Sequence, residues 1–162
     1  MLRPPPKLMY AIEAVLDIAY NAVGEPVQSS DITRRQGISR RYLEPVLQQL
    51  VRAGLLVGVR GPKGGYRLAR ERRRISLGDI TRVVLDLTED PFGDENGGDG
   101  NGREATRSGG SALGREVVRP LWRDLEDEML ERLDAITIEE LCLRARRAGL
   151  EGDRFRDLDF SI

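Results

Sequence analysis

The fold is decided by residues 39–66, which read SRRYLEPVLQQLVRAGLLVGVRGPKGGY. Ser39 is a suitable N-cap, and the apolar residues behind it recur at spacings of three and four, which predicts an amphipathic helix that Gly54 ends. The apolar stripe of this helix is Leu43, Val46, Leu47, Leu50 and Val51. After Gly54 two β-prone segments, 55–60 and 66–69, enclose a Pro/Gly turn, which predicts a hairpin.

Pro45 is the irregular position within this predicted helix. A proline inside a helix removes one backbone donor and crowds the carbonyl four residues earlier, here that of Arg41. We therefore expect a local kink or a late start of the regular helix, with the apolar stripe in phase through Leu50.

Two further helices are predicted upstream. Apolar residues at three- and four-residue spacings predict an amphipathic helix over residues 8–23, ended by Gly24. Ser29 or Ser30 is a suitable N-cap for a short helix that Gly37 ends. A long first helix, followed by two helices joined through a tight glycine-containing turn, is typical of a helix-turn-helix, and a hairpin directly after it is a wing.

A fourth helix and a long loop are predicted after the hairpin. Ser76 and Asp79 have the spacing of a capping box, which opens a helix that extends to Leu87. Residues 90–111 contain seven glycines and almost no apolar side chains. Such a segment cannot bury a core, so we expect a mobile loop.

Two more helices are predicted near the carboxyl end. Residues 113–133 carry apolar side chains at four-residue spacing, and Pro120 is expected to bend the first turns of that helix. Thr137 and Glu140 have the spacing of a second capping box, at the start of a last helix that Gly149 ends. No structure is assigned to the tail.

The long helix carries six to eight large apolar side chains, which need to be covered. It either folds back on the first domain or pairs with its copy in a second chain, and we favour pairing because most soluble oligomers are symmetric homodimers. The candidate interface residues are Leu113, Val117, Val118, Leu121, Trp122, Leu125, Met129 and Leu133.

The net charge of −1 conceals a division of the chain into a basic and an acidic part. Residues 1–75 carry 14 Lys and Arg against 6 Asp and Glu, net +8, whereas residues 76–162 carry 12 against 21, net −9. A basic part of this size attracts polyanions. The alternative is a chance asymmetry of solvated surface charge.

The composition excludes several other classes of protein. No run of about 18 apolar residues exists to span a bilayer, and residues 1–7 do not resemble a secretory signal, so we expect a cytoplasmic protein without a membrane partner. One cysteine, Cys142, and no histidine exclude an intramolecular disulfide and the usual zinc sites. Because the chain also lacks a histidine general base, a P-loop and a nucleophile elbow, we expect no enzyme.

Residues 42–66 strongly resemble the winged-helix transcription regulators of the Rrf2 family. The most specific matches are the wing sequence Arg60-Gly61-Pro62-Lys63-Gly64-Gly65-Tyr66 and the opening Ser39-x-x-Tyr42-Leu43-Glu44 of the second helix of the helix-turn-helix. The likeness covers residues 7–88 and resumes at 121–125 and 136–141, where it resembles the IscR-like branch. The resemblance implies a regulator that binds double-stranded promoter DNA as a homodimer.

The chain departs from that branch at the family's iron-sulfur site. The cluster-binding members carry three cysteines in the loop before the long helix, and residues 90–111 contain none. We therefore predict no cofactor and no metal, with an iron-sulfur cluster of atypical ligands around Cys142 as the alternative. Cys142 is interpreted first as a small buried apolar residue, and a redox-sensing thiol or metal ligand stays open.

The predicted reading surface lies at the start of the second helix of the helix-turn-helix. Such a helix enters the major groove with its first residues toward the base edges. The candidates, on the face opposite the apolar stripe, are Ser39, Arg40, Arg41, Glu44 and Gln48. The arginines could read guanine or contact phosphate, the glutamine could read adenine, and Glu44 could accept a bond from cytosine or pair with Arg40.

The wing supplies a second group of candidates. Its glycine-rich turn would let backbone and cations approach the minor groove, and the residues are Arg60, Gly61, Pro62, Lys63 and Gly64. Tyr66 is expected to pack the wing onto the helices, and the arginines at 70 and 72–74 to meet phosphates if they reach DNA.

The sequence therefore predicts a mainly α fold class with a small β-hairpin wing: a winged helix-turn-helix over 1–88, a flexible acidic loop over 89–111, a dimerisation helix and final helix over 112–149, and a tail over 150–162. The predicted function is sequence-specific DNA binding by a homodimeric repressor of iron-sulfur cluster assembly or iron homeostasis genes. The alternatives are a regulator of sulfur or cysteine metabolism controlled by a partner protein or metabolite, and an interaction module that does not bind DNA.

Overall fold

The computed structural model describes residues 3–22, 24–85, 111–150 and 152. The loop expected over 90–111, except for its last residue, the expected helix end at Leu87 and nearly all of the tail lie outside the described residues. The elements in chain order are α1 (Pro6–Asn21), α2 (Ser29–Gln36), α3 (Arg40–Arg52), β1 (Leu56–Val59), β2 (Gly65–Leu68), η1 (Arg72–Arg74), α4 (Leu77–Leu85), η2 (Gly114–Val118), α5 (Arg119–Asp134) and α6 (Ile138–Arg147).

The predicted winged helix-turn-helix is confirmed, with small shifts at the helix ends. α1 begins at Pro6, two residues earlier than expected, because proline lacks the amide hydrogen that a first turn leaves unpaired. The expectation that Ser29 or Ser30 caps α2 is wrong: Gln28 is the N-cap, and Ser29 is the first helical residue. Gly37 ends α2 in the left-handed conformation, with a φ of 67°.

The helices of the winged body share one hydrophobic core. α1 and α3 contribute fully buried side chains such as Val15, Ile18 and Leu47, and Ile32 of α2 packs into the same cluster. Ile80 of α4 and residues of α6 close the core from the other side. α2 and α3 are therefore held by apolar contacts with α1, and the exposed face of α3 is presented in a fixed orientation.

The hairpin is tied to the segment that precedes α2. β1 and β2 pair antiparallel, with Leu56 opposite Leu68. Val27 adds a bridge to Tyr66 through two backbone hydrogen bonds of 2.9 and 2.8 Å. At Gly65 a Cβ atom would lie 2.3 Å from the Val27 carbonyl oxygen, so only glycine permits this close approach.

Pro45 and Pro120 are accommodated differently. α3 begins at Arg40 and continues through Pro45, so a late start of the regular helix is excluded. Before Pro120 the chain forms a π-helical turn, η2, in which the Arg119 amide donates to the Gly114 carbonyl five residues earlier. A widened turn next to a proline is a common response to the donor that proline lacks.

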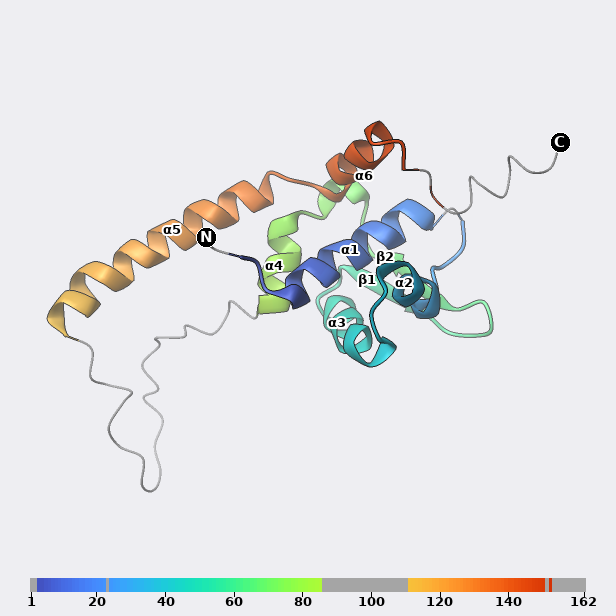
Figure 1. The fold of residues 1–162 in the computed structure, drawn as a ribbon, viewed down its shortest axis with the longest axis horizontal. Helices are drawn as coiled ribbons and strands as arrows, with labels where there is room; N and C mark the ends of the chain where they lie inside the picture. Colours follow the sequence, from blue (N-terminus) through green and yellow to red (C-terminus); the bar gives the residue numbers. More distant parts are fainter. Residues whose placement is uncertain (1–2, 23, 86–110, 151, 153–162) are drawn as a thin grey trace, which may run out of the picture.

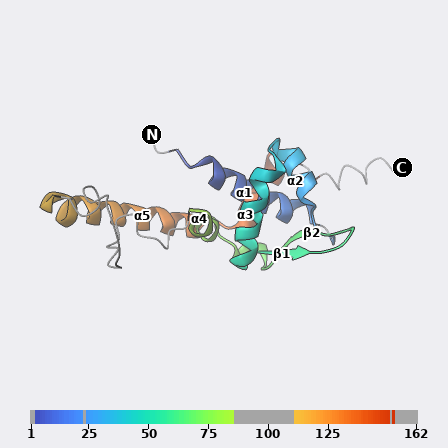
Figure 2. The ribbon, with the colours of Figure 1, turned by 90° about the horizontal axis from the view of Figure 1, so that it is seen from below.

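α5 extends away from the winged body as a long arm, on the side opposite the hairpin turn (Figures 1 and 2). None of its residues is buried, and the apolar side chains of η2 and α5 are between 45% and 58% exposed at Val117, Val118, Leu121, Trp122, Leu125 and Met129. The alternative that this helix folds back into an intramolecular core is therefore wrong for the described residues. No helix in the described part of the chain is long and apolar enough to cross a membrane.

Candidate nucleic-acid interface

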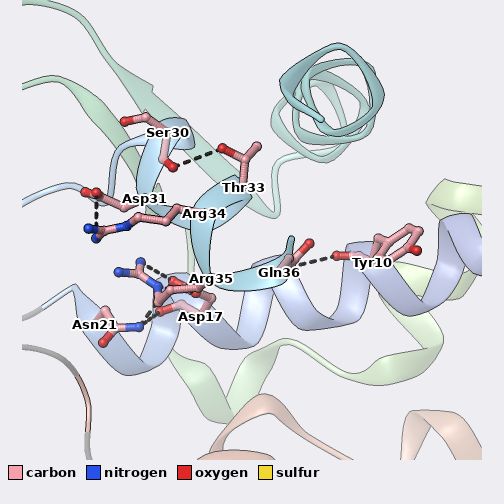
Figure 3. A network of polar contacts seen from close by, with 9 residues as sticks. All are labelled: Tyr10, Asp17, Asn21, Ser30, Asp31, Thr33, Arg34, Arg35 and Gln36. Carbon is pink, nitrogen blue, oxygen red and sulfur yellow. Dashed lines mark hydrogen bonds and ion pairs between the residues drawn. The ribbon is translucent and has the colours of Figure 1, made fainter. Parts of the chain in front are cut away.

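A polar network fixes α2 on α1 (Figure 3). The Arg35 guanidinium of α2 donates two hydrogen bonds of 2.6 Å, from Nε and from the terminal nitrogen, to the two carboxylate oxygens of Asp17 in α1. The Asp17 and Arg35 side chains are only 11% and 23% exposed. Gln36 adds a hydrogen bond to the Tyr10 carbonyl at 3.4 Å. The first helix of the helix-turn-helix is therefore anchored by a mostly buried ion pair.

α3 presents a polar face directly opposite its buried stripe. Leu43, Val46, Leu47 and Leu50 are buried, whereas the predicted reading residues Ser39, Arg40, Arg41 and Gln48 are exposed and Glu44 is half-buried. The amphipathic pattern of the helix thus exposes two adjacent cations and one amide on the face opposite the core. Ser39 is the N-cap residue by position, with an extended backbone.

Glu44 pairs with Arg40 in this structure. The Arg40 Nε atom lies 2.6 Å from a Glu44 carboxylate oxygen, which is the intrahelical pairing that the four-residue spacing allows. Tyr66 of the wing lies close to this pair: burial and the Glu44 charge raise its pKa, and the Arg40 charge opposes that shift. The start of α3 and strand β2 are thus neighbours, and Tyr66 packs against the core as expected.

The wing turn places its two cations in solvent. Arg60, Gly61, Pro62 and Lys63 are exposed, and Gly64 is half-buried. A Cβ atom on Gly64 would lie 2.3 Å from the Val59 carbonyl oxygen, so this glycine is required by the hairpin itself. The glycines were predicted to allow approach to DNA, and the structure shows that at least this one is needed for the turn to close.

Two residues near this surface make contacts that the sequence did not predict. The Gln28 side chain donates to the Pro62 carbonyl at 3.4 Å and so joins the start of α2 to the wing turn. Tyr42 is exposed on α3 and stacks edge-on against Tyr10 of α1, with ring centroids 5.5 Å apart. The position of a glutamine before a predicted N-cap is a weak signal, and the contact with Tyr10 spans 32 residues, so neither could be found from local patterns.

The arginines that follow the wing belong to a different face. Arg70, Arg72 and Arg73 line a cleft of about 500 Å³ together with Glu71 and Glu139 of α6. Arg73 pairs with Glu71 at 2.6 Å. Glu139 belongs to α6, and α6 lies on the other side of α1 from α3 (Figure 1), so the structure does not bring this arginine cluster onto the α3 surface.

Cys142 lies in the core of the winged body. Its side chain is 2% exposed, and burial raises the pKa of its thiol although the Arg72 and Arg146 charges oppose the shift. A cluster needs several thiolate or imidazole donors, and the chain has one cysteine and no histidine. Within the described residues no group of three or more potential metal ligands occurs. The donor set therefore does not fit an iron-sulfur cluster.

The fold and the exposed cationic face define a winged helix-turn-helix regulator. The model of the Rrf2 family, described as "Iron-dependent Transcriptional regulator", matches residues 6–144, and the chain belongs to this family. It is therefore a DNA-binding transcription regulator, in agreement with the expectation that it is not an enzyme.

Several relatives share most of the chain. The HTH-type transcriptional regulator IscR of Vibrio vulnificus is 39% identical over 153 residues, which cover 94% of this chain and 83% of the relative. IscR of Vibrio cholerae is 37% identical over 145 residues, 88% and 76% of the two chains. Among solved structures, IscR of T. potens has a TM-score of 0.66 at 32% identity and covers 91% of this chain and 90% of its own. CymR, the global cysteine regulator of B. subtilis, has a TM-score of 0.63 at 28% identity, with coverage of 89% and 98%.

Proposed function

We propose that two copies of the chain bind one promoter duplex, each inserting α3 into a major groove and laying its wing turn along the neighbouring minor groove. The observation that carries this proposal is the exposure of the cationic start of α3 together with that of a wing turn that carries Arg60 and Lys63. The base-reading residues are Ser39, Arg40, Arg41, Glu44 and Gln48, and the wing contacts come from Arg60, Gly61, Pro62, Lys63 and Gly64. In this arrangement the two α3 helices lie about 34 Å apart, one turn of DNA.

The Arg40–Glu44 pair gives this surface two modes of contact. While the pair holds, Glu44 is neutralised and Arg41 is the free cation at the start of α3. If Arg40 turns to a phosphate or a guanine, Glu44 is released to accept a hydrogen bond from a cytosine amino group. Opening an exposed pair of this kind costs at most about 1 kcal/mol, which one charged contact to DNA offsets.

The homodimer is proposed from the exposed arm. The apolar side chains on η2 and α5 form a stripe that water covers in the single chain. A second copy supplies an identical stripe, and two-fold pairing of amphipathic helices buries both. The interface consists of Leu113, Val117, Val118, Leu121, Trp122, Leu125, Met129 and Leu133.

The genes controlled are proposed from the relatives. The relatives named IscR support a cytoplasmic repressor of iron-sulfur assembly or iron homeostasis genes. A second candidate, regulation of cysteine metabolism through a partner protein or a metabolite, is favoured by the likeness to CymR and by the lack of a cluster donor set.

Fluorescence anisotropy with a duplex selected from a random library tests DNA binding. Arg41→Ala should weaken binding about tenfold, because it removes the free cation at the groove. Arg147→Ala is the matched control, since it removes the same charge from an exposed position on α6 and should leave the affinity for DNA unchanged. Equal affinities for both variants, or no binding by the parent at low salt, would contradict the proposal.

A further inference from the structure

The point where α5 meets the winged body is a joint built from contacts between distant parts of the chain. The residues before α4 pair with those after α5: the Leu77 amide donates to the Ile136 carbonyl, and the Ile138 amide donates to the Ile75 carbonyl, both at 2.9 Å. Ser76 and Thr137 form the antiparallel bridge between these bonds. Ile75 and Ile138 are fully buried, so the pairing is part of the core.

A side-chain clamp reinforces this joint at the last residue of α5. The Arg82 guanidinium of α4 donates two hydrogen bonds, of 2.7 and 2.6 Å, to the two carboxylate oxygens of Asp134, and the Ser76 hydroxyl donates a third at 3.3 Å. Ser76 also takes part in a reciprocal capping box with Asp79, in which each side chain bonds the other residue's amide at 3.0 Å. The end of α5 is thereby tied to the first turn of α4.

Gly78 makes room for the clamp. It lies in the first turn of α4, and a Cβ atom there would fall 1.8 Å from an Asp134 carboxylate oxygen and 2.9 Å from a nitrogen of Arg82. Its φ is not in the left-handed region, so the backbone does not require glycine at this position. An alanine here would displace the paired ends of the Asp134 and Arg82 side chains.

We propose that Gly78, Arg82 and Asp134 are positioning residues that set the spacing of DNA half-sites, a proposal that rests on the homodimeric DNA binding proposed above. In a dimer paired along α5, this joint is the link, among the described residues, that orients each winged body relative to its partner. The hairpin turn lies on the far side of the body from α5 (Figures 1 and 2). For a body of about 80 residues the distance from the joint to the hairpin turn is on the order of 20 Å. A rotation of about 10° at the joint therefore moves the wing by about 3 Å, close to the rise of one base pair.

The test uses the full-length protein and an operator selected from random duplexes, remade with the two half-sites moved apart or together by one and two base pairs. The parent should lose about tenfold in affinity for each base pair of displacement. Gly78→Ala and Asp134→Ala should flatten this preference to less than about threefold while retaining the parent's affinity for an isolated half-site. Exchanging the charges in the double variant Arg82→Asp/Asp134→Arg should restore part of the preference.

Arg144→Ala is the matched control, because it breaks an arginine–carboxylate pair within α6 whose side chains are 61% and 42% exposed, against 42% for both members of the clamp. Its spacing preference should equal that of the parent. The proposal would be overturned if Gly78→Ala and Asp134→Ala kept the parent's preference for one half-site spacing. It would also be overturned if the parent bound operators of every spacing equally well. Variants that unfold or become monomeric would also overturn it, since the clamp would then hold the fold rather than the register. A parent that binds no duplex would instead contradict the proposed function.

Discussion

Removal of the Asp17 carboxylate is the sharpest test of how the helix-turn-helix is held together. In the parent the Arg35 side chain lies between α1 and α2 and is only 23% exposed. Asp17→Ala removes both of its 2.6 Å hydrogen bonds to the carboxylate, and Asn21 loses its 3.2 Å contact with the same group. Breaking one side of a mostly buried pair costs about 3 kcal/mol, because the buried guanidinium loses the carboxylate that offsets its desolvation. For a chain of this size that lowers the melting temperature by about 6–12 °C.

The control for this prediction is the exposed ion pair of the neighbouring arginine on α2, Arg34. Asp31→Ala removes the partner of Arg34, an ion pair at 3.2 Å whose side chains are 43% and 71% exposed. An exposed pair contributes less than about 1 kcal/mol, so this variant should melt close to the parent temperature. Calorimetry or circular dichroism on both variants gives the comparison. Similar losses for Asp17→Ala and Asp31→Ala would refute the inference that burial of the Arg35 pair anchors α2.

Three further predictions follow from single contacts. Gly64→Ala should destabilise the hairpin by about 1–3 kcal/mol and weaken DNA binding, because its Cβ would lie 2.3 Å from the Val59 carbonyl oxygen. Gly58→Ala should be tolerated, since the space at that position is open. Equal effects of the two variants in thermal melts and anisotropy would count against this. Cys142 is 2% exposed and burial raises its pKa, so its thiol should resist thiol reagents at pH 7 and react when the protein unfolds. Its contribution to stability should be lost only as the pH rises above 9.0, the ordinary pKa of a thiol, because the thiol of the unfolded chain then ionises first. Rapid labelling of the folded protein would contradict this. Leu125→Asp should convert the protein to a monomer in sedimentation. Leu143→Asp on α6 should leave the dimer intact, although Leu143 is 44% exposed and Leu125 48%. A dimer in both cases would exclude α5 as the interface.

Local patterns predicted the elements and several of their ends. The capping box of Ser76 and Asp79 forms with both expected hydrogen bonds, and Thr137 accepts a bond from the Glu140 amide as expected. Glu140 itself is bonded by Arg144, so the second box is only half formed in the described contacts. Signals of this kind are readable because every partner lies within a few residues.

The contacts that position the candidate site depend on pairings that no local pattern contains. Gln28 contacts the wing turn across 34 residues, and Asp134 reaches Arg82 across 52. The requirement for glycine at position 78 arises only from that second pairing, since its backbone conformation is open to other residues. The π-helical turn before Pro120 is likewise not predicted, because the proline reveals a missing backbone donor but not how the helix adjusts to it.

The central claim is that the cationic start of α3 and the wing read duplex DNA as part of a two-copy complex. Its most direct test is the affinity for a selected operator and for a random duplex, measured by anisotropy over a range of salt concentrations and combined with sedimentation of the labelled complex. The expected result is two chains per operator, a log affinity that falls linearly with log salt, and at least about a thousandfold preference for the operator at physiological salt. Equal affinity for both duplexes, or one chain bound per operator, would contradict the account.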